Sequence, residues 1–500
     1  GGGGGGGSGG DDLPPLVKQA DKVTAPPPEP KFANDIERFK HAVKGEPDNA
    51  HLHHALAFAL ANVEKRYKDA LPSYKRAIEL EPTNAAFRVD HGVALAAVGR
   101  REDAIAEHRE AVRLCENGTA TGDADVTVVL VNALIELGNA YSGTGGDGDV
   151  EATKYYERCL AVDKDNEVCV YNLAGLHRRT GDCTKAASMY KRLIQLEGGE
   201  AAAKADTMCR LGEALRAADI EDGTSGNEHA AVAALRKAID KDAKHVDARQ
   251  LLAAMLEARG DADAALEQYR AALDAAKKAD ASDAAAIVPL QTSIGNLLLD
   301  RGEVSDAIDA LHAAVALAKK CALSAAGGES AVHAASAHVS LACALKEGGA
   351  GDAARAEFDA AVDALRAVRT TEEHVAAARD EQLAVAEANF GHLLDDYGEQ
   401  TAAIEHYRAA LKLDPGNGTT LNKLGACLIA TGDVDGGMAA FTEGLAVSPD
   451  DALLHYNLAA AYAEHHQDLA KALEHCQAAC DADPNFAEGK HMLGVLQQYM

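Results

Sequence analysis

The chain has 500 residues, a formal net charge of −29, 47% hydrophobic residues and only 4% aromatic residues. A field of that sign repels phosphate backbones and acidic membrane surfaces, which excludes nucleic acid as a favoured partner. The low aromatic content argues against a large sandwich or barrel core, and no apolar run approaches the roughly 20 residues that a membrane span needs. We therefore expect no nucleic-acid binding and no membrane insertion.

The N-terminal 31 residues form a segment of unusual composition. Residues 1–31 hold a Gly run, two Asp residues and a Pro run at 26–28. Such a composition cannot bury enough apolar area to order the chain, so we predict a disordered Gly/Pro-rich tail. The chain begins with Gly rather than Met, which leaves room for a targeting segment upstream in a longer protein.

From residue 32 onward a small residue, Gly or Ala, recurs in one fixed setting. The residue before it is apolar in eleven of twelve cases, and a second small residue and then a larger, often aromatic one follow further on. Apolar and small residues at i, i+3 or i+4 and i+7 lie on one helical face, so each unit is predicted to be two antiparallel helices, A and B. The twelve small positions are Ala57, Gly92, Gly138, Ala174, Gly212, Ala253, Gly295, Ala342, Gly391, Gly425, Ala459 and Gly494.

The spacing of these units has a physical meaning. Equivalent positions are 34 or 35 residues apart in six of the eleven intervals between Ala42 and Ala479. A small residue lets neighbouring helices approach closely, while Tyr, Phe or Leu fills the gap beside it. A Pro that cannot continue helix B closes several units, as at Pro82 and Pro415. A helix-hairpin period of 34 residues is that of the tetratricopeptide repeat.

On these residues the chain resembles the tetratricopeptide-repeat (TPR) family over about residues 32–500. The resemblance implies an all-α fold, a TPR-type α-solenoid in which about 12 antiparallel helix hairpins stack into a superhelix. One position departs from the family pattern, because the family often carries an aromatic residue four places before the small one and this chain has no Trp. The residues there include His53, Arg88, Val170, Arg249 and Glu387.

The period lengthens in two different ways. Around 117–125 and 220–227 the added residues are rich in Gly, Asp, Thr and Asn, which predicts surface loops. Over about residues 273–410 the helical pattern itself continues, for example through 275–279, which predicts longer and irregular repeats. Regular repeats are expected over about residues 384–500.

The ten cysteines include no CxxC pair and mostly occupy helix-packing positions, Cys159 among them. We therefore expect reduced, buried thiols and a cytoplasmic location, with a ciliary or nuclear one left open. Cys476 and Cys480 have the i, i+4 spacing that can chelate a metal, but Cys476 takes the place that Tyr fills elsewhere and Ala479 beside Cys480 is the packing position. No metal and no other cofactor is predicted.

The sequence carries none of the motifs that mark common catalytic sites. It contains no GxSxG, no P-loop, no HExxH and no dinucleotide fingerprint, so we predict that the chain is not an enzyme. Stacked A helices instead line a concave groove. We therefore predict a protein–protein interaction scaffold that binds partner segments, proteins or peptides, in this groove, as a subunit of a larger multi-subunit complex.

At the groove positions that the family implies, three consecutive units form one local exception to the acidic background of the chain. Polar amides and cations occupy these positions, and we expect them to form a single patch. The candidate peptide-binding residues are Asn139, Asn172, Arg178, Arg179, Arg210 and Arg216.

Two alternative functions follow from the family resemblance. Asn139, Asn172 and Arg210 resemble three of the five residues of the carboxylate clamp, by which co-chaperone TPR domains hold acidic C-terminal peptides. Ile135 and Asp206 stand where the two clamp lysines should be, which removes two charge-assisted hydrogen bonds of roughly 1.5–3 kcal/mol each. The other alternative is a regulatory arm of an enzyme, such as an O-GlcNAc-transferase-like protein, whose catalytic domain lies outside this chain.

Overall fold

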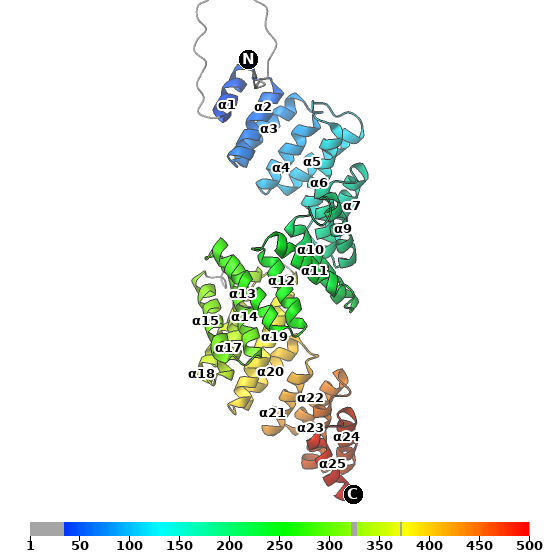
Figure 1. Ribbon diagram of the computed structural model, residues 1–500, viewed down its shortest axis with the longest axis vertical. Helices are drawn as coiled ribbons and strands as arrows, with labels where there is room; N and C mark the ends of the chain where they lie inside the picture. Colours follow the sequence, from blue (N-terminus) through cyan, green and yellow to red (C-terminus); the bar gives the residue numbers. More distant parts are fainter. Residues whose placement is uncertain (1–34, 322–327, 371–372, 500) are drawn as a thin grey trace, which may run out of the picture. The chain divides into compact units, whose positions relative to one another are not determined.

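The computed structural model describes residues 35–321, 328–370 and 373–499 (Figure 1). It is 81% helical, with 24 α-helices and no strand among the described residues. The all-α fold expected from the sequence is confirmed. The tail expected at residues 1–31 lies outside the described residues. Among the described residues, no helix is both long and apolar enough to cross a membrane.

The chain divides into two compact units, Gly1–Leu176 and His177–Met500, and the boundary falls inside helix α8. The helices up to this boundary are α1 (Asp35–Gly45), α2 (Ala50–Phe58), the π-helix η1 (Ala59–Val63), α3 (Tyr67–Leu80), α4 (Ala85–Ala97), α5 (Arg101–Glu116), α6 (Val126–Tyr141), α7 (Gly146–Val162) and α8 (Glu167–Arg179).

The second unit continues with longer helices in its middle part. These helices are α9 (Cys183–Leu196), α10 (Ala205–Asp222), α11 (Glu228–Lys241), α12 (Val246–Ala258), α13 (Ala262–Ala279), α14 (Ala284–Asp300), α15 (Val304–Lys320), α17 (Gly328–Glu347), α18 (Gly351–Ala367), α19 (Glu373–Asp396), α20 (Gln400–Leu413), α21 (Gly418–Ala430), α22 (Val434–Val447), α23 (Ala452–Ala461), the π-helix η2 (Tyr462–His466), α24 (Leu469–Ala482) and α25 (Ala487–Tyr499).

Within each unit consecutive helices pack as hairpins (Figure 1). In the first unit α2 packs on α3, α4 on α5 and α6 on α7, and in the second the same pairing runs from α10 with α11 to α23 with α24. The first helix of each pair is the predicted helix A and the second is helix B. Neighbouring A helices also touch, as α4 touches α6 and α17 touches α19. The predicted helix hairpins are thus confirmed.

The recurring small residue of helix A is explained by a large side chain of helix B. A Cβ atom on Gly138 would lie 2.4 Å from the ring of Tyr156, and one on Gly391 would lie 2.6 Å from the ring of Tyr407. Where the position is Ala, as at Ala174, the residue is fully buried. Close packing leaves no room for a larger residue at these positions, which confirms their interpretation as packing positions. Gly494 is an exception, because a Cβ atom there would meet no atom of the described residues within 4 Å.

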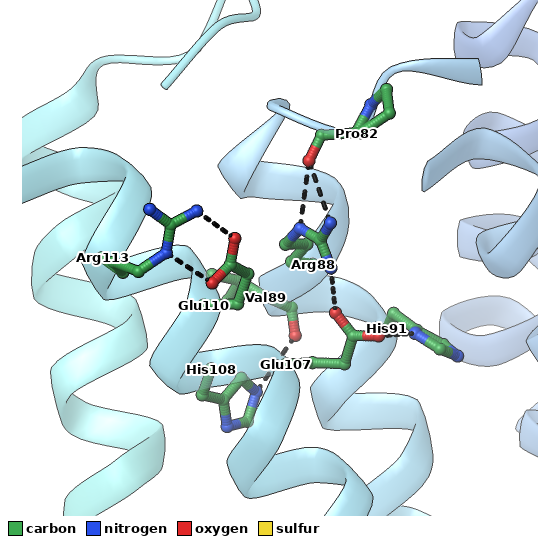
Figure 2. Close-up of polar contacts among 8 residues, drawn as sticks. All are labelled: Pro82, Arg88, Val89, His91, Glu107, His108, Glu110 and Arg113. Carbon is green, nitrogen blue, oxygen red and sulfur yellow. Dashed lines mark hydrogen bonds and ion pairs between the residues drawn. The ribbon is translucent and has the colours of Figure 1, made fainter. Parts of the chain in front are cut away.

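Four residues before the small position, a polar side chain links three parts of its hairpin. Arg88 on α4 donates hydrogen bonds to the Pro82 carbonyl from Nε (3.2 Å) and Nη2 (3.0 Å), and its Nη1 lies 2.8 Å from Glu107 on α5 (Figure 2). The Arg88 side chain thereby links the turn to both helices. Corresponding pairs between helix A and helix B are Arg249–Gln268, His338–Glu357, Glu387–His406 and His455–His475.

A buried histidine, His108 on α5, fills the gap beside Gly92 that Tyr, Phe or Leu fills in other hairpins. Its Nε2 donates to the Val89 carbonyl at 3.2 Å (Figure 2), while its buried Nδ1 has no hydrogen-bond partner within the described part of the chain. Burial lowers the pKa of His108, because a charged ring would lose its hydration. The ring is therefore packed as a neutral group.

The expectation of reduced thiols is wrong for one pair of cysteines. Cys159 on α7 and Cys169 on α8 form a disulfide, with their Cα atoms 6.7 Å apart. Both residues are fully buried and face each other where one hairpin passes into the next. The other eight cysteines, all within the described residues, are free. The argument from reduced thiols to a cytoplasmic location does not hold for this pair.

The inserted loops follow the prediction except at one end. Residues 117–125 lie between α5 and α6, as expected. At 220–227 the helix continues further than predicted, because α10 runs to Asp222 and Gly223 then ends it in the left-handed conformation at φ 62°. Ile220 is therefore helical and not part of the predicted loop.

Candidate functional site

The six candidate residues lie on the A helices α6, α8 and α10, and they fall into one group in each compact unit. The first unit holds Asn139 and Asn172, and the second holds the four arginines. The boundary between the units falls inside α8, between Asn172 and Arg178, and we describe each group by itself.

The amide pair of the first unit is already hydrogen-bonded. The Nδ2 of Asn172 donates to Oδ1 of Asn139 at 3.0 Å, and the Tyr156 hydroxyl donates to the same oxygen at 2.7 Å. Glu136 lies one helical turn away, and burial raises its pKa although a hydrogen bond with Asn139 opposes that shift. A ligand carboxylate would meet this carboxyl group. The pair is better suited to the neutral amides of a peptide backbone.

On α2 and α4 of the first unit, exposed apolar side chains take the repeat position that Asn139 has on α6. Phe58 on α2 and Val93 on α4 occupy the position directly after the small residue, as Asn139 does on α6, and they are 48% and 37% exposed. His54 and Asp90 join these two helices, with Nε2 and Oδ2 2.7 Å apart. The sequence reasoning missed the two apolar residues, although they have the same position in the repeat register as Asn139.

In the second unit two candidate arginines share one carboxylate. Nη1 of Arg178 lies 3.0 Å from Oε1 of Glu213, and Nη1 of Arg210 lies 3.1 Å from Oε2. Arg210 also lies 3.5 Å from Asp206 and 4.0 Å from Asp247. A ligand carboxylate must therefore compete with acidic groups of the fold. Glu213 was missed, although residues three apart are neighbours on a helix and its spacing from Arg210 was the available signal.

The remaining two arginines differ in their surroundings. Arg179, the last residue of α8, already has an interaction partner. Arg216 on α10 lines a pocket of about 390 Å³ together with residues of the following loop and of α12. Arg216 therefore lies beside an open cavity.

The described residues hold no group of three or more His, Cys, Asp and Glu that could bind a metal. Cys476 is fully buried, with Sγ 3.2 Å from the Gly489 carbonyl. Burial raises the pKa of this thiol to about 11, so it stays protonated near neutral pH. Its surroundings are those of a packed side chain rather than of a ligand.

Comparisons with known proteins find the same repeat in three places. A tetratricopeptide-repeat family model matches residues 55–119 and 224–281, and a second one matches residues 397–462. Among solved structures, the chain is similar to YrrB, described as a TPR protein with an unusual peptide-binding site. The two are 20% identical over 44% of this chain and 96% of that chain, with a TM-score of 0.32. No curated protein matches.

Proposed function

Because the chain is a tetratricopeptide-repeat protein, we propose that it is a non-enzymatic scaffold that binds segments of partner proteins on the exposed faces of its A helices, within a larger assembly. The repeat is generally a non-catalytic interaction module. The charge of −29 keeps such a scaffold apart from nucleic acid and favours protein partners.

The observation that carries this proposal is the exposure of apolar side chains on helix faces that the fold does not use for packing. Phe58 and Val93 occupy one repeat position on successive A helices, and both are exposed, whereas the small residue directly before each is buried. Exposed apolar groups that recur at one repeat position offer a partner segment apolar surface to bury. The amides of Asn139 and Asn172 extend the same register and supply hydrogen bonds that do not depend on a partner's sequence.

A second candidate function is the binding of acidic C-terminal peptides, as by a co-chaperone-like adaptor. The feature in its favour is Glu213, whose carboxylate lies between the guanidinium groups of Arg178 and Arg210. A ligand carboxylate could take the place that Glu213 holds. Asp206 and Asp247 around Arg210 oppose this function, so we rank it second.

Substituting Asp for the exposed apolar residues of the A helices should abolish partner binding. We expect the full chain with Phe58→Asp and Val93→Asp to lose the proteins that the parent chain captures from native lysate, because a carboxylate there cannot be desolvated against an apolar partner. Both side chains are exposed, so the fold should tolerate the change. Captured proteins are identified and quantified by mass spectrometry.

The matched control is Val162→Asp, an exposed position on the B helix α7 of the same unit. It introduces the same charge on the opposite kind of helix and should leave capture unchanged. Partners that the A-face double variant retains and the Val162→Asp variant loses would overturn the proposal.

A further inference from the structure

The pocket beside Arg216 has mainly apolar walls. It lies between the C-terminal parts of α10 and α12 and is lined there by Ile220, Met255 and Ala258. Met255 is buried, whereas Ile220 is 70% exposed, a high value for a large aliphatic side chain. The volume of about 390 Å³ falls within the roughly 300–1,000 Å³ of ligand pockets. Because α10 extends beyond its predicted end, Ile220 lies on the helix and lines the pocket.

The loop that closes the pocket is fixed by one buried carboxylate. Both oxygens of Asp219 accept from the backbone N–H of Asn227 at 3.0 Å, and Oδ1 also accepts from the Asn227 side chain at 3.0 Å and from the Thr224 hydroxyl at 3.2 Å. These bonds satisfy the Asp219 carboxylate and hold the loop in one conformation. The pocket wall is therefore preorganised, which lowers the entropy lost on binding.

The charges around the pocket leave one cation available. The Asp219 carboxylate accepts hydrogen bonds from Asn227 of the loop. Glu228 forms an ion pair with Arg259, with Oε1 and Nε 3.1 Å apart. Across the described part of the chain, no carboxylate forms an ion pair with Arg216. An unpaired guanidinium thus stands beside an apolar cavity in a strongly acidic protein.

We propose that this pocket receives a large aliphatic side chain of a partner segment, and that Arg216 binds an Asp or Glu side chain two residues away in that segment. Arg216 and Ile220 are one helical turn apart, about 6 Å. Alternate side chains of an extended peptide are about 6.6–6.8 Å apart on one side. The spacing of the two groups therefore matches the pattern Leu-x-Glu. This inference rests on the proposed function and names the chemistry of the partner.

The test uses fluorescein-labelled peptides with blocked ends, of the sequence Gly-Ser-Leu-Ser-Glu-Ser-Gly, and matched peptides with Lys in place of Glu or Ala in place of Leu. Fluorescence anisotropy with the full chain should show preferential binding of the Leu-x-Glu peptide. Arg216→Glu should weaken it at least tenfold, since a charged hydrogen bond is lost and a like charge is added. The same variant should gain affinity for the Leu-x-Lys peptide.

Two further variants separate the pocket from general effects. Ile220→Asp should also weaken binding of the Leu-x-Glu peptide. Because Ile220 is exposed, the substitution should not unfold the chain. Arg236→Glu makes the same charge change at an exposed position of α11 outside the pocket and should have no effect. Unchanged affinity in Arg216→Glu, or equal binding of all three peptides by the parent chain, would overturn the proposal.

The remaining outcomes distinguish this inference from the proposed function. If no peptide binds while the parent chain still captures partners through Phe58 and Val93, the pocket proposal fails and the scaffold proposal stands. If the parent chain also captures no partner proteins, the pocket proposal and the scaffold proposal both fail. If sedimentation shows that Arg216→Glu and Ile220→Asp abolish self-association of the chain, a second copy fills the pocket and the peptide proposal is wrong.

Discussion

Replacing Tyr407 by Ala should lower the free energy of unfolding by about 3–5 kcal/mol, the usual cost of removing a buried aromatic ring. Tyr407 on α20 is fully buried and fills the space beside Gly391 on α19. Without the ring, helix A and helix B of this hairpin lose their main contact at the small position, and rigid helices cannot close the cavity completely. Urea unfolding followed by circular dichroism measures the loss.

The control is Tyr407→Phe, which keeps the ring and removes only the hydroxyl. That hydroxyl is buried and has no hydrogen-bond partner among the described residues. Removing it should leave stability unchanged or raise it slightly, because an unsatisfied buried polar group is itself a cost. A Phe variant as unstable as the Ala variant would show that the ring does not fill the gap beside Gly391.

Replacing Arg88 by Ala should lower the free energy of unfolding by about 3 kcal/mol, as expected when one partner of a mostly buried ion pair is removed. Arg88 and Glu107 are 17% and 21% exposed, so the remaining carboxylate is poorly solvated. The Pro82 carbonyl also loses its two donors (Figure 2). Thermal unfolding of the full chain measures the change.

The same variant should alter the response to acid. Burial alone would raise the pKa of Glu107, but hydrogen bonds from His91 and Arg88 outweigh it and hold the pKa below the ordinary value of 4.5. A carboxyl of this kind stabilises the fold above its ordinary pKa and loses that contribution as pH falls through its folded-state value. Without Arg88, the loss should begin at higher pH.

Figure 2 also contains the control for this prediction. Arg113 pairs with Glu110 on the exposed side of α5. Exposed ion pairs contribute little, because solvent screens them and ordering two long side chains costs entropy. Arg113→Ala should therefore change neither the stability nor its acid dependence. Equal effects of the two substitutions would contradict the bridging role of Arg88.

Most of the fold could be predicted from the sequence because its packing rule is local and repeated. The gap beside Gly138 is filled by a residue 18 positions later on the partner helix, so spacing alone identifies both helices. The disulfide between Cys159 and Cys169 was not predictable in this way. Such a pair does not recur in the other units that the structure describes, and both residues occupy ordinary packing positions. The loop was placed from Ile220 onward, although Gly223 is the residue that ends α10.

The candidate site could be predicted only in part. Repeat register placed Asn139 and Asn172 in neighbouring units, and the structure has a hydrogen bond between them. Register also assigned Arg210 to a groove position, but it gave no account of Glu213, which neutralises that arginine. The pocket at Arg216 depends on how far α10 extends and on how Asp219 folds the loop, neither of which follows from repeat spacing.

Site-specific photo-cross-linking tests the scaffold claim most directly. A photoreactive residue replaces Phe58 or Ala426 on A helices, and Val162 or Val447 on B helices, all four positions being exposed. Each full-length variant is irradiated in native lysate, and cross-linked proteins are identified by mass spectrometry. The account predicts that the A-helix positions cross-link specific partners and the B-helix positions do not. Partners cross-linked only from Val162 and Val447 would contradict it.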